Sequence, residues 1–311
     1  MNKLTEMLKD ALREETGGAI DGISVVSDVK MSALSSFKTG GPCAVLMTPN
    51  SPDMLSASFR AVKRCGIRFC VLGNGTNVLC SDKGFDGAVI LLTALKNFGF
   101  VENVMTAECG MPITSAALAA SRRALSGLEF AYGIPGTVGG AVYMNAGAYG
   151  GETSAVCEKS DYLDLSDFSV KTLSGPEQHF GYRHSAYQCG DKIIIRAYFR
   201  LVPGDGELIT AQMNEFMRRR IEKQPLEYPS AGSVFKRSSA GYTGEMIEKC
   251  GLKGRRIGGA QISEKHAGFI INRGGASSAD ILALISLVRE SVREKFGVEL
   301  ECEIRKIGDF D

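Results

Sequence analysis

The sequence lacks a charge excess, a long apolar run and a paired-cysteine motif, and each absence excludes a class of protein. Its 36 basic and 35 acidic side chains nearly cancel, so no overall field attracts nucleic acid or an anionic membrane. No uncharged apolar stretch is long enough to span a bilayer, and residues 1–15 lack the apolar core of a signal peptide. Its nine cysteines form no C-x-x-C pair, which favours free thiols over disulfides or a zinc site. We therefore expect a cytoplasmic protein that binds no membrane, nucleic acid or metal.

Two nucleotide-binding motifs and one nucleophile motif are missing as well. The loop at residues 73–77 (GNGTN) follows a predicted strand, but it lacks the third glycine of the dinucleotide fingerprint and the helix after it. The Gly-Lys-Ser/Thr sequence of a P-loop does not occur. The nucleophile elbow G-x-S-x-G is also absent, and the only histidines are His179, His184 and His266.

Glycine-rich loops are what the sequence has instead. Residues 130–151 (FAYGIPGTVGGAVYMNAGAYGG) contain seven glycines and no charged side chain. So much glycine disfavours the interior of a helix or strand, whereas amides without a crowding Cβ can line a diphosphate or a flat ring system. A string of tight turns in an apolar core explains this segment equally well. Two further loops, residues 39–42 (TGGP) and 73–77, favour a dinucleotide cradle, although the second alone is more often a simple turn.

Hydrophobic periodicity and capping residues predict the main elements. Helices are predicted at residues 1–15, 51–66, 112–124, 208–223 and 279–296. Strands are predicted at residues 67–72, 78–80 and 88–92, several times between 154 and 201, and at 299–304. A domain boundary is predicted near residues 204–206 (GDG), where a charged helix begins.

Two candidate catalytic side chains stand in distinctive surroundings, and each has an ordinary alternative. Arg183 follows Tyr182, where a planar cation could steady a carboxylate or an enolate oxygen, or simply stack on the ring at the surface. Ser233 follows a glycine that would let a ligand approach its hydroxyl. As a catalyst this serine would give a proton rather than attack an acyl group, and otherwise it would cap an element or form a turn.

The remaining candidates carry weaker patterns. Three glutamates share one face of the strand predicted at residues 299–304, and the pattern selects none of Glu299, Glu301 and Glu303. Lys223, after three arginines, could contact a phosphate or complete a basic helix end. His266 is more often a satisfied core histidine than a ligand.

Taken together, these segments resemble the family of UDP-N-acetylenolpyruvoylglucosamine reductases, flavoenzymes of peptidoglycan precursor synthesis. The likeness runs from about residue 35 to 308, although residues 35–37 depart from the usual wording and the first 30 match nothing specific. The uninterrupted stretch after Tyr182 resembles the shorter type, which lacks an extra substrate-covering loop. The motifs that carry the likeness are TGGP (39–42), GNGTN (73–77), GLEFAYGIPGTVGGAVYMNAGAYGGE (127–152), GYR (181–183), KQPLEYPSAGSVFK (223–236), GRRIGGAQISEKHAGFIIN (254–272) and KFGVELECEI (295–304).

The resemblance implies an α+β fold with noncovalently bound FAD. Residues 1–30 would be a helical extension, and residues 31–202 a FAD-binding region of the PCMH/vanillyl-alcohol-oxidase type with two subdomains split near 93. Residues 203–311 would form an α/β substrate-binding domain. The implied FAD-binding residues are Thr39, Gly40, Gly73, Asn74, Gly75, Thr76, Asn77, Gly133, Ile134, Pro135, Gly136, Thr137, Gly139, Gly140, Asn145, Gly147 and Ile195.

The resemblance also implies a two-step reduction. NADPH would reduce the flavin, and the flavin N5 would then pass hydride to UDP-N-acetylglucosamine enolpyruvate, giving UDP-N-acetylmuramate. Ser233 would supply the proton, while Arg183 and Glu303 would stabilise the enolate. The implied substrate-binding residues are Tyr182, Lys223, Lys236 and His266.

A monomer is the expected state. Two other readings remain open at this point. One is a flavin oxidase or dehydrogenase of the same cofactor fold, and the other is a noncatalytic UDP-sugar sensor.

Overall fold

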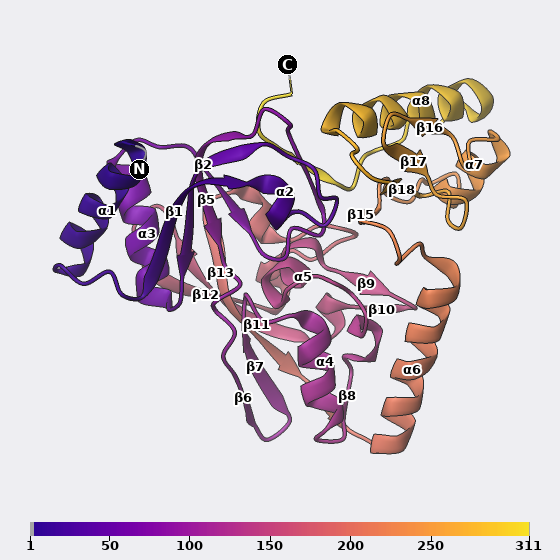
Figure 1. Ribbon diagram of the computed structural model, residues 1–311. Helices are drawn as coiled ribbons and strands as arrows, with labels where there is room; N and C mark the ends of the chain where they lie inside the picture. The colour runs from indigo at the N-terminus through magenta and orange to yellow at the C-terminus, as the bar shows by residue number, and fades with distance from the viewer. Residues whose placement is uncertain (1–2, 311) are drawn as a thin grey trace. The chain divides into compact units, whose positions relative to one another are not determined.

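The computed structural model describes residues 3–310 and mixes helices with mainly antiparallel sheets (Figure 1). By internal contacts the chain divides into two units. The first unit comprises Met1–Ser27, Val45–Asn74 and Gly87–Arg219, and the second comprises Asp28–Ala44, Gly75–Asp86 and Arg220–Asp311. Each unit encloses its own cluster of buried apolar side chains. The domain boundaries expected near residues 30 and 202 stay predictions.

The elements follow one another along the chain as helices and short strands. The α-helices of the described residues are α1 (Lys3–Thr16), α2 (Met31–Leu34), α3 (Pro52–Arg64), α4 (Ile113–Ser121), α5 (Val138–Met144), α6 (Gly206–Lys223), α7 (Thr243–Lys249) and α8 (Ser278–Phe296). The strands are β1 (Ile23–Lys30), β2 (Pro42–Pro49), β3 (Phe69–Leu72), β4 (Val78–Cys80), β5 (Phe85–Leu91), β6 (Phe98–Val101), β7 (Val104–Glu108), β8 (Leu125–Ser126), β9 (Gly147–Ala148), β10 (Gly151–Glu152), β11 (Cys157–Asp164), β12 (Val170–Ser174), β13 (Lys192–Arg200), β14 (Val202–Pro203), β15 (Ser230–Ser233), β16 (Arg256–Ile257), β17 (Ala260–Ile262), β18 (Phe269–Asn272) and β19 (Arg305–Ile307). Within residues 3–310, no helix is long and apolar enough to cross a membrane.

Helices α1 and α3 pack against each other in the first unit (Figure 1). Leu8 and Leu12, one helical turn apart on α1, are fully buried. Ser51 caps α3, because its hydroxyl accepts a hydrogen bond from the N–H three residues later, and a proline occupies the first helical position. Both helices were predicted, and the first two residues of the expected N-terminal helix lie outside the described range.

An antiparallel sheet in the order β12-β11-β13-β7-β6 forms the centre of the first unit. Its middle strand, β13, buries three successive isoleucines at residues 193–195, which a strand can do only when both of its faces are covered. A second sheet has the order β1-β2-β5-β3, and the division between the two units falls within β1, β2 and β5.

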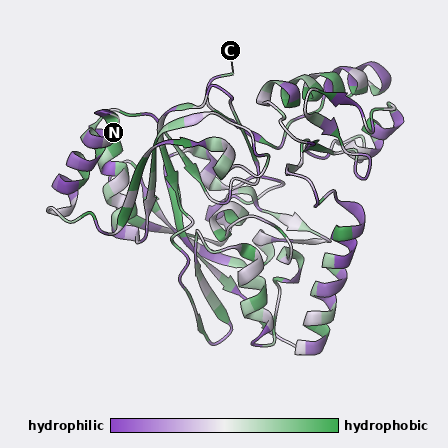
Figure 2. Ribbon diagram, in the orientation of Figure 1, coloured by the Kyte–Doolittle hydropathy of each residue, from purple (hydrophilic) through white to green (hydrophobic). Residues whose placement is uncertain are grey.

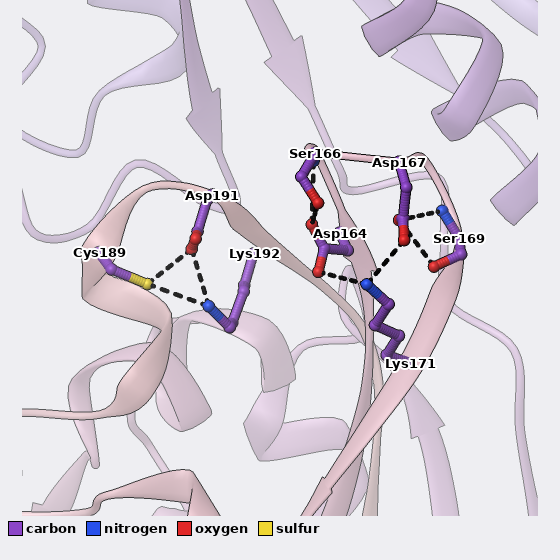
Figure 3. Close-up of polar contacts among 8 residues, drawn as sticks. All are labelled: Asp164, Ser166, Asp167, Ser169, Lys171, Cys189, Asp191 and Lys192. Carbon is purple, nitrogen blue, oxygen red and sulfur yellow. Dashed lines mark hydrogen bonds and ion pairs between the residues drawn. The ribbon is translucent and has the colours of Figure 1, made fainter.

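The turn between β11 and β12 is organised by charged side chains (Figure 3). Lys171 Nζ lies 2.8 Å from a carboxylate oxygen of both Asp164 and Asp167. Asp164 also accepts hydrogen bonds from Ser166, and Asp167 accepts them from Ser169. These bonds, chiefly those from Lys171, hold the pKa of Asp164 well below its usual range and lower that of Asp167 to about 2. The groups are solvent-exposed, so the bonds shape the turn more than they stabilise the fold.

A second polar cluster precedes β13 (Figure 3). Asp191 Oδ1 accepts from the Cys189 thiol over 2.7 Å and from Lys192 Nζ over 3.0 Å. Both bonds lower the pKa of Asp191, and the carboxylate in turn raises the pKa of Lys192. Cys189 is the exposed member of nine free cysteines.

Burial suppresses the ionisation of several other thiols. It raises the pKa of Cys80, Cys109 and Cys157 to about 12, and it also raises that of Cys43. A thiol reacts as its thiolate, so these four side chains are unreactive while the fold is closed. Cys109 and Cys157 belong to the first unit, whereas Cys43 and Cys80 belong to the second.

The second unit contains a sheet in the order β15-β18-β17-β16, against which helix α8 packs. A capping box between Ser277 and Asp280 begins α8, and Gly297, at φ +67°, ends it. Figure 2 shows hydrophobic and hydrophilic residues alternating along this helix, as a helix with one covered face requires. The buried face consists of Ile281, Leu284, Ile285, Val288 and Val292.

The strand predicted at residues 299–304 is wrong. The ordered strand is β19, just beyond it, which pairs in parallel with β4. Residues 299–304 are extended but make a single β-bridge, from Cys302 to Phe235. Their alternation is real as a burial pattern, since Leu300 and Ile304 are buried, but it occurs without a hydrogen-bonded ladder.

Candidate active site

Residues 73 and 74 contact the 133–137 turn within the first unit. Asn74 Nδ2, just after β3, donates a 2.8 Å hydrogen bond to the carbonyl oxygen of Pro135. A Cβ added at Gly73 would lie only 2.5 Å from Thr137 Oγ1, so no larger residue fits there without movement. The structure therefore places residues 73 and 74 next to the 133–137 turn.

Several polar groups of these loops have no partner within residues 3–310. The backbone N–H groups of residues 73–77 donate to no protein acceptor in that range. In the second unit, Thr39 is 2% exposed, and its hydroxyl has no hydrogen-bond partner. The same is true of the Ser36 hydroxyl, which sequence reasoning did not select. Because buried polar groups are normally satisfied, the donors of residues 36, 39 and 75–77 in the second unit fit an acceptor-rich ligand such as a diphosphate.

The segment around residue 140 forms helix α5, although its glycine content argued against any helix. Thr137 caps α5 by accepting from Gly140 N over 3.2 Å. An added Cβ at Gly139 would lie 2.8 Å from the Cβ of Cys109, so the missing side chain lets the helix pack closely. The N–H of Gly139 donates to the Cys109 carbonyl. The backbone N–H groups of Gly139 and Gly140 therefore both have protein acceptors and are not available to a cofactor. These glycines could help a cofactor only by leaving space where a side chain would lie.

The other predicted cofactor residues of the first unit lie in turns and strands. Gly133, at φ +83°, donates its N–H to Thr114 Oγ1, and Gly136 accepts a backbone hydrogen bond. Gly147 lies in β9 opposite β10. Ile195 is 1% exposed in β13.

Arg183 lies at the tip of a tight turn in the first unit. Gly181 and His184 exchange two backbone hydrogen bonds of 3.1 Å around it. Arg183 has φ +55°, a left-handed conformation that costs a side-chain-bearing residue about 1–3 kcal/mol. Its guanidinium carbon lies 5.1 Å from the ring centre of Tyr182, which is the stacking that the ordinary alternative anticipated.

Ser233 and Glu303 are brought together in the second unit. Ser233 is exposed at the end of β15, and the N–H of Glu303 donates to the carbonyl of Val234 over 2.8 Å. Asn77, a predicted cofactor residue, donates from Nδ2 to the carbonyl of Glu303 over 3.2 Å. A serine hydroxyl and a carboxyl group therefore lie on adjoining extended segments.

The C-terminal glutamates Glu299 and Glu301 form exposed ion pairs. Glu299 lies 3.9 Å from Arg289 and 3.8 Å from Arg293. Glu301 pairs with Lys236, so that predicted substrate-binding lysine already has a carboxylate partner. Glu303 is half-buried next to β15.

His266 lies near Ser233, in surroundings that disfavour its charged form. Burial lowers its pKa, and its Nδ1 accepts the N–H of Gly268 over 3.1 Å. A Cβ added at Gly268 would lie 3.0 Å from His266 Cε1 and 3.9 Å from Ser233 Oγ. Lys223, by contrast, is exposed at the last position of α6.

Comparisons with known proteins identify the family of the chain. Residues 43–167 match the family model described as FAD binding domain, and residues 224–307 match the C-terminal domain of UDP-N-acetylenolpyruvoylglucosamine reductase. Together, fold and loops define an FAD-dependent oxidoreductase, which confirms the predicted fold class and cofactor. The chain belongs to the UDP-N-acetylenolpyruvoylglucosamine reductase family.

The relatives are similar over nearly their full lengths. The reductase of Caldicellulosiruptor bescii is 47% identical over 292 residues, which cover 93% of each chain. That of Caldanaerobacter subterraneus subsp. tengcongensis is 45% identical over 306 residues, 98% of each chain. The crystal structure of the Thermus caldophilus reductase is 32% identical, has a TM-score of 0.78, and covers 92% of this chain and 98% of that one.

Proposed function

We propose that this chain reduces UDP-N-acetylglucosamine enolpyruvate to UDP-N-acetylmuramate, with NADPH as reductant and noncovalently held FAD. The observation that carries the proposal is the pairing of a family-matched FAD-binding domain with Ser233 and Glu303 on adjoining segments. FAD held by the glycine-rich loops would supply hydride transfer, from NADPH to the methylene carbon of the enolpyruvyl group.

The chain contributes preorganised hydrogen-bond donors to cofactor binding. In the second unit, the backbone N–H groups at 75–77 and the hydroxyl of Thr39 are unpartnered within the described residues, so binding a diphosphate there breaks no protein hydrogen bond. Gly40 lets the loop at residues 39–42 pack closely against Cys80, because an added Cβ at Gly40 would lie 2.6 Å from the Cβ of Cys80.

The proton and the charge are handled by three side chains. Ser233 Oγ gives its proton to the carbon next to the carboxylate, where position matters more than a matched pKa because a carbanion is a strong base. Arg183 and Glu303 stabilise the enolate oxygen that develops before that proton arrives. The proposed substrate contacts are Tyr182, Lys223, Lys236 and His266. Lys236 would leave its ion pair with Glu301 in order to bind the substrate.

Anaerobic stopped-flow absorbance of the purified protein tests the proposal. NADPH should bleach the yellow flavin, and the enolpyruvyl nucleotide should then restore the colour while forming UDP-N-acetylmuramate. A colourless protein would support a noncatalytic sensor instead. Flavin that stays attached after denaturation would support an oxidase or dehydrogenase with tethered FAD.

A further inference from the structure

We propose that Asn145 positions Arg183, by holding the turn at residues 181–184 to the end of helix α5. This inference rests on the proposed function, in which Arg183 stabilises the enolate. It assigns Asn145 a task different from the cofactor contact that the family resemblance implied.

The side-chain amide of Asn145 is committed to the protein. Asn145 is 1% exposed and ends α5 in a left-handed conformation, at φ +42°. Its Nδ2 donates to the carbonyl of Gly181 over 3.0 Å, and its Oδ1 accepts the N–H of Ser154 over 2.9 Å. Reversing the amide would set two oxygens against each other, so these partners fix its orientation.

The Gly181 carbonyl is one of the two acceptors that close the turn. It already receives the N–H of His184, and Asn145 adds a second donor to the same oxygen. The left-handed backbone of Arg183 is unfavourable in isolation and persists only if its surroundings hold it. Asn145 supplies part of that restraint.

A second side chain ties the same turn to α5. Gln188 Nε2 donates to the carbonyl of Arg183 and to that of Tyr143, each over 3.0 Å. Ser185 Oγ donates to the Tyr143 carbonyl over 2.8 Å. The carbonyl of Tyr143, near the end of α5, is thus satisfied by the segment that carries Arg183, and this couples the helix end to the turn.

Buried hydrogen bonds anchor the chain on both sides of the turn. Ser160 Oγ, in β11, donates to Gln178 Oε1 over 2.6 Å and lies 2.6 Å from the hydroxyl of Tyr187. All three residues are at most 1% exposed. The chain is therefore anchored before and after the turn. The hydrogen bonds of Asn145 and Gln188 restrain the conformation of the turn itself.

A double-mutant cycle on the FAD-loaded enzyme tests this coupling. Asn145→Asp keeps the acceptor for Ser154 but places a carboxylate oxygen against the Gly181 carbonyl. We expect it to slow flavin reoxidation by the enolpyruvyl nucleotide about 10- to 100-fold, because small displacements of an oriented group cost that much. Flavin content and reduction by NADPH should not change. In an Arg183→Ala background, the same substitution should change reoxidation less than about twofold.

Asn103 provides the matched control, since its Nδ2 donates to the Leu201 carbonyl over 2.8 Å at another turn of the first unit. Asn103→Asp should leave reoxidation unchanged. If the Asp variant at position 145 does not fold, Asn145→Gly removes the side chain while suiting the left-handed backbone.

Each outcome decides between readings. Full additivity with Arg183→Ala would overturn the positioning role while leaving the proposed function intact. Equal loss of FAD binding or of NADPH reduction would make Asn145 a cofactor contact instead. If Arg183→Ala alone left reoxidation unchanged, the proposed role of Arg183 would fail first, and the positioning role with it.

Discussion

Glu303 donates its backbone N–H to the carbonyl oxygen of Val234 over 2.8 Å, which sets Glu303 beside the strand end that carries Ser233. The relationship is made by main-chain atoms, so substitution of either side chain leaves it in place. The roles of the two side chains can therefore be tested separately.

Replacing Ser233 by alanine should separate the two half-reactions. Flavin reduction by NADPH should be unchanged, whereas reoxidation by the enolpyruvyl nucleotide should slow about 10²- to 10⁴-fold, because the proton donor is lost. Stopped-flow absorbance measures both steps. Ser166→Ala, in the β11–β12 turn, is the control. Similar losses in both steps would count against a proton-donor role.

Glu303 should act through a hydrogen bond rather than through charge. A glutamine amide keeps a hydrogen-bond donor at this position and removes the possibility of charge. Glu303→Ala should therefore lower the reoxidation rate about 10²- to 10³-fold, and Glu303→Gln clearly less. Glu299→Gln, which alters only an exposed ion pair, should have no effect. Equal rates for the alanine and glutamine variants would contradict this role.

Adjacent glycines of α5 should respond oppositely to alanine. Gly139→Ala forces a Cβ to within 2.8 Å of Cys109 and should lower the free energy of unfolding by about 1–3 kcal/mol. At Gly140 the nearest atom to an added Cβ is Thr137 Oγ1, at 3.5 Å. Gly140→Ala should therefore raise the free energy of unfolding by up to about 1 kcal/mol. Urea denaturation of both variants measures the difference. A destabilised Gly140→Ala would mean that the helix end is tighter than described.

His266 should make the fold sensitive to acid. Burial lowers its pKa in the folded state, so the unfolded chain binds the extra proton as pH falls through about 6.5, and stability drops below that pH. Above about pH 6.5 the contribution is fully present. His266→Asn keeps an acceptor for the Gly268 N–H and should lose less stability than wild type between about pH 7.5 and about pH 5.5.

The control for this comparison is His179→Asn, because His179 is exposed and has φ +45°, which asparagine also tolerates. Urea midpoints at the two pH values supply the measurement. If the urea midpoints of wild type and His266→Asn fell by the same amount on acidification, groups other than His266 would account for the loss of stability.

Local signals made much of the fold predictable. Ser51 and the proline after it identified the start of α3, and the apolar spacing identified α8, because each signal lies within its own element. At residues 299–304 the alternation described burial only, and a ladder needs a partner strand that no local pattern reveals. Helix α5 had one usable signal, the capping Thr137, which the surrounding glycines obscured.

The site residues were proposed from the family pattern, and sequence reasoning gave no geometry for them. Glu301 pairs with Lys236, which lies 65 residues away in sequence, and no local pattern reveals that contact. The contact of Asn145 with Gly181 spans 36 residues, and no spacing rule connects them. Gln188 was missed for the same reason.

The buried thiols offer a separate reading of each unit's integrity. An alkylating reagent reaches Cys109 and Cys157 only when the first core opens, and Cys80 only when the second does. Mass spectrometry of the labelled peptides would therefore reveal whether the two halves loosen together or one before the other, without any inserted probe.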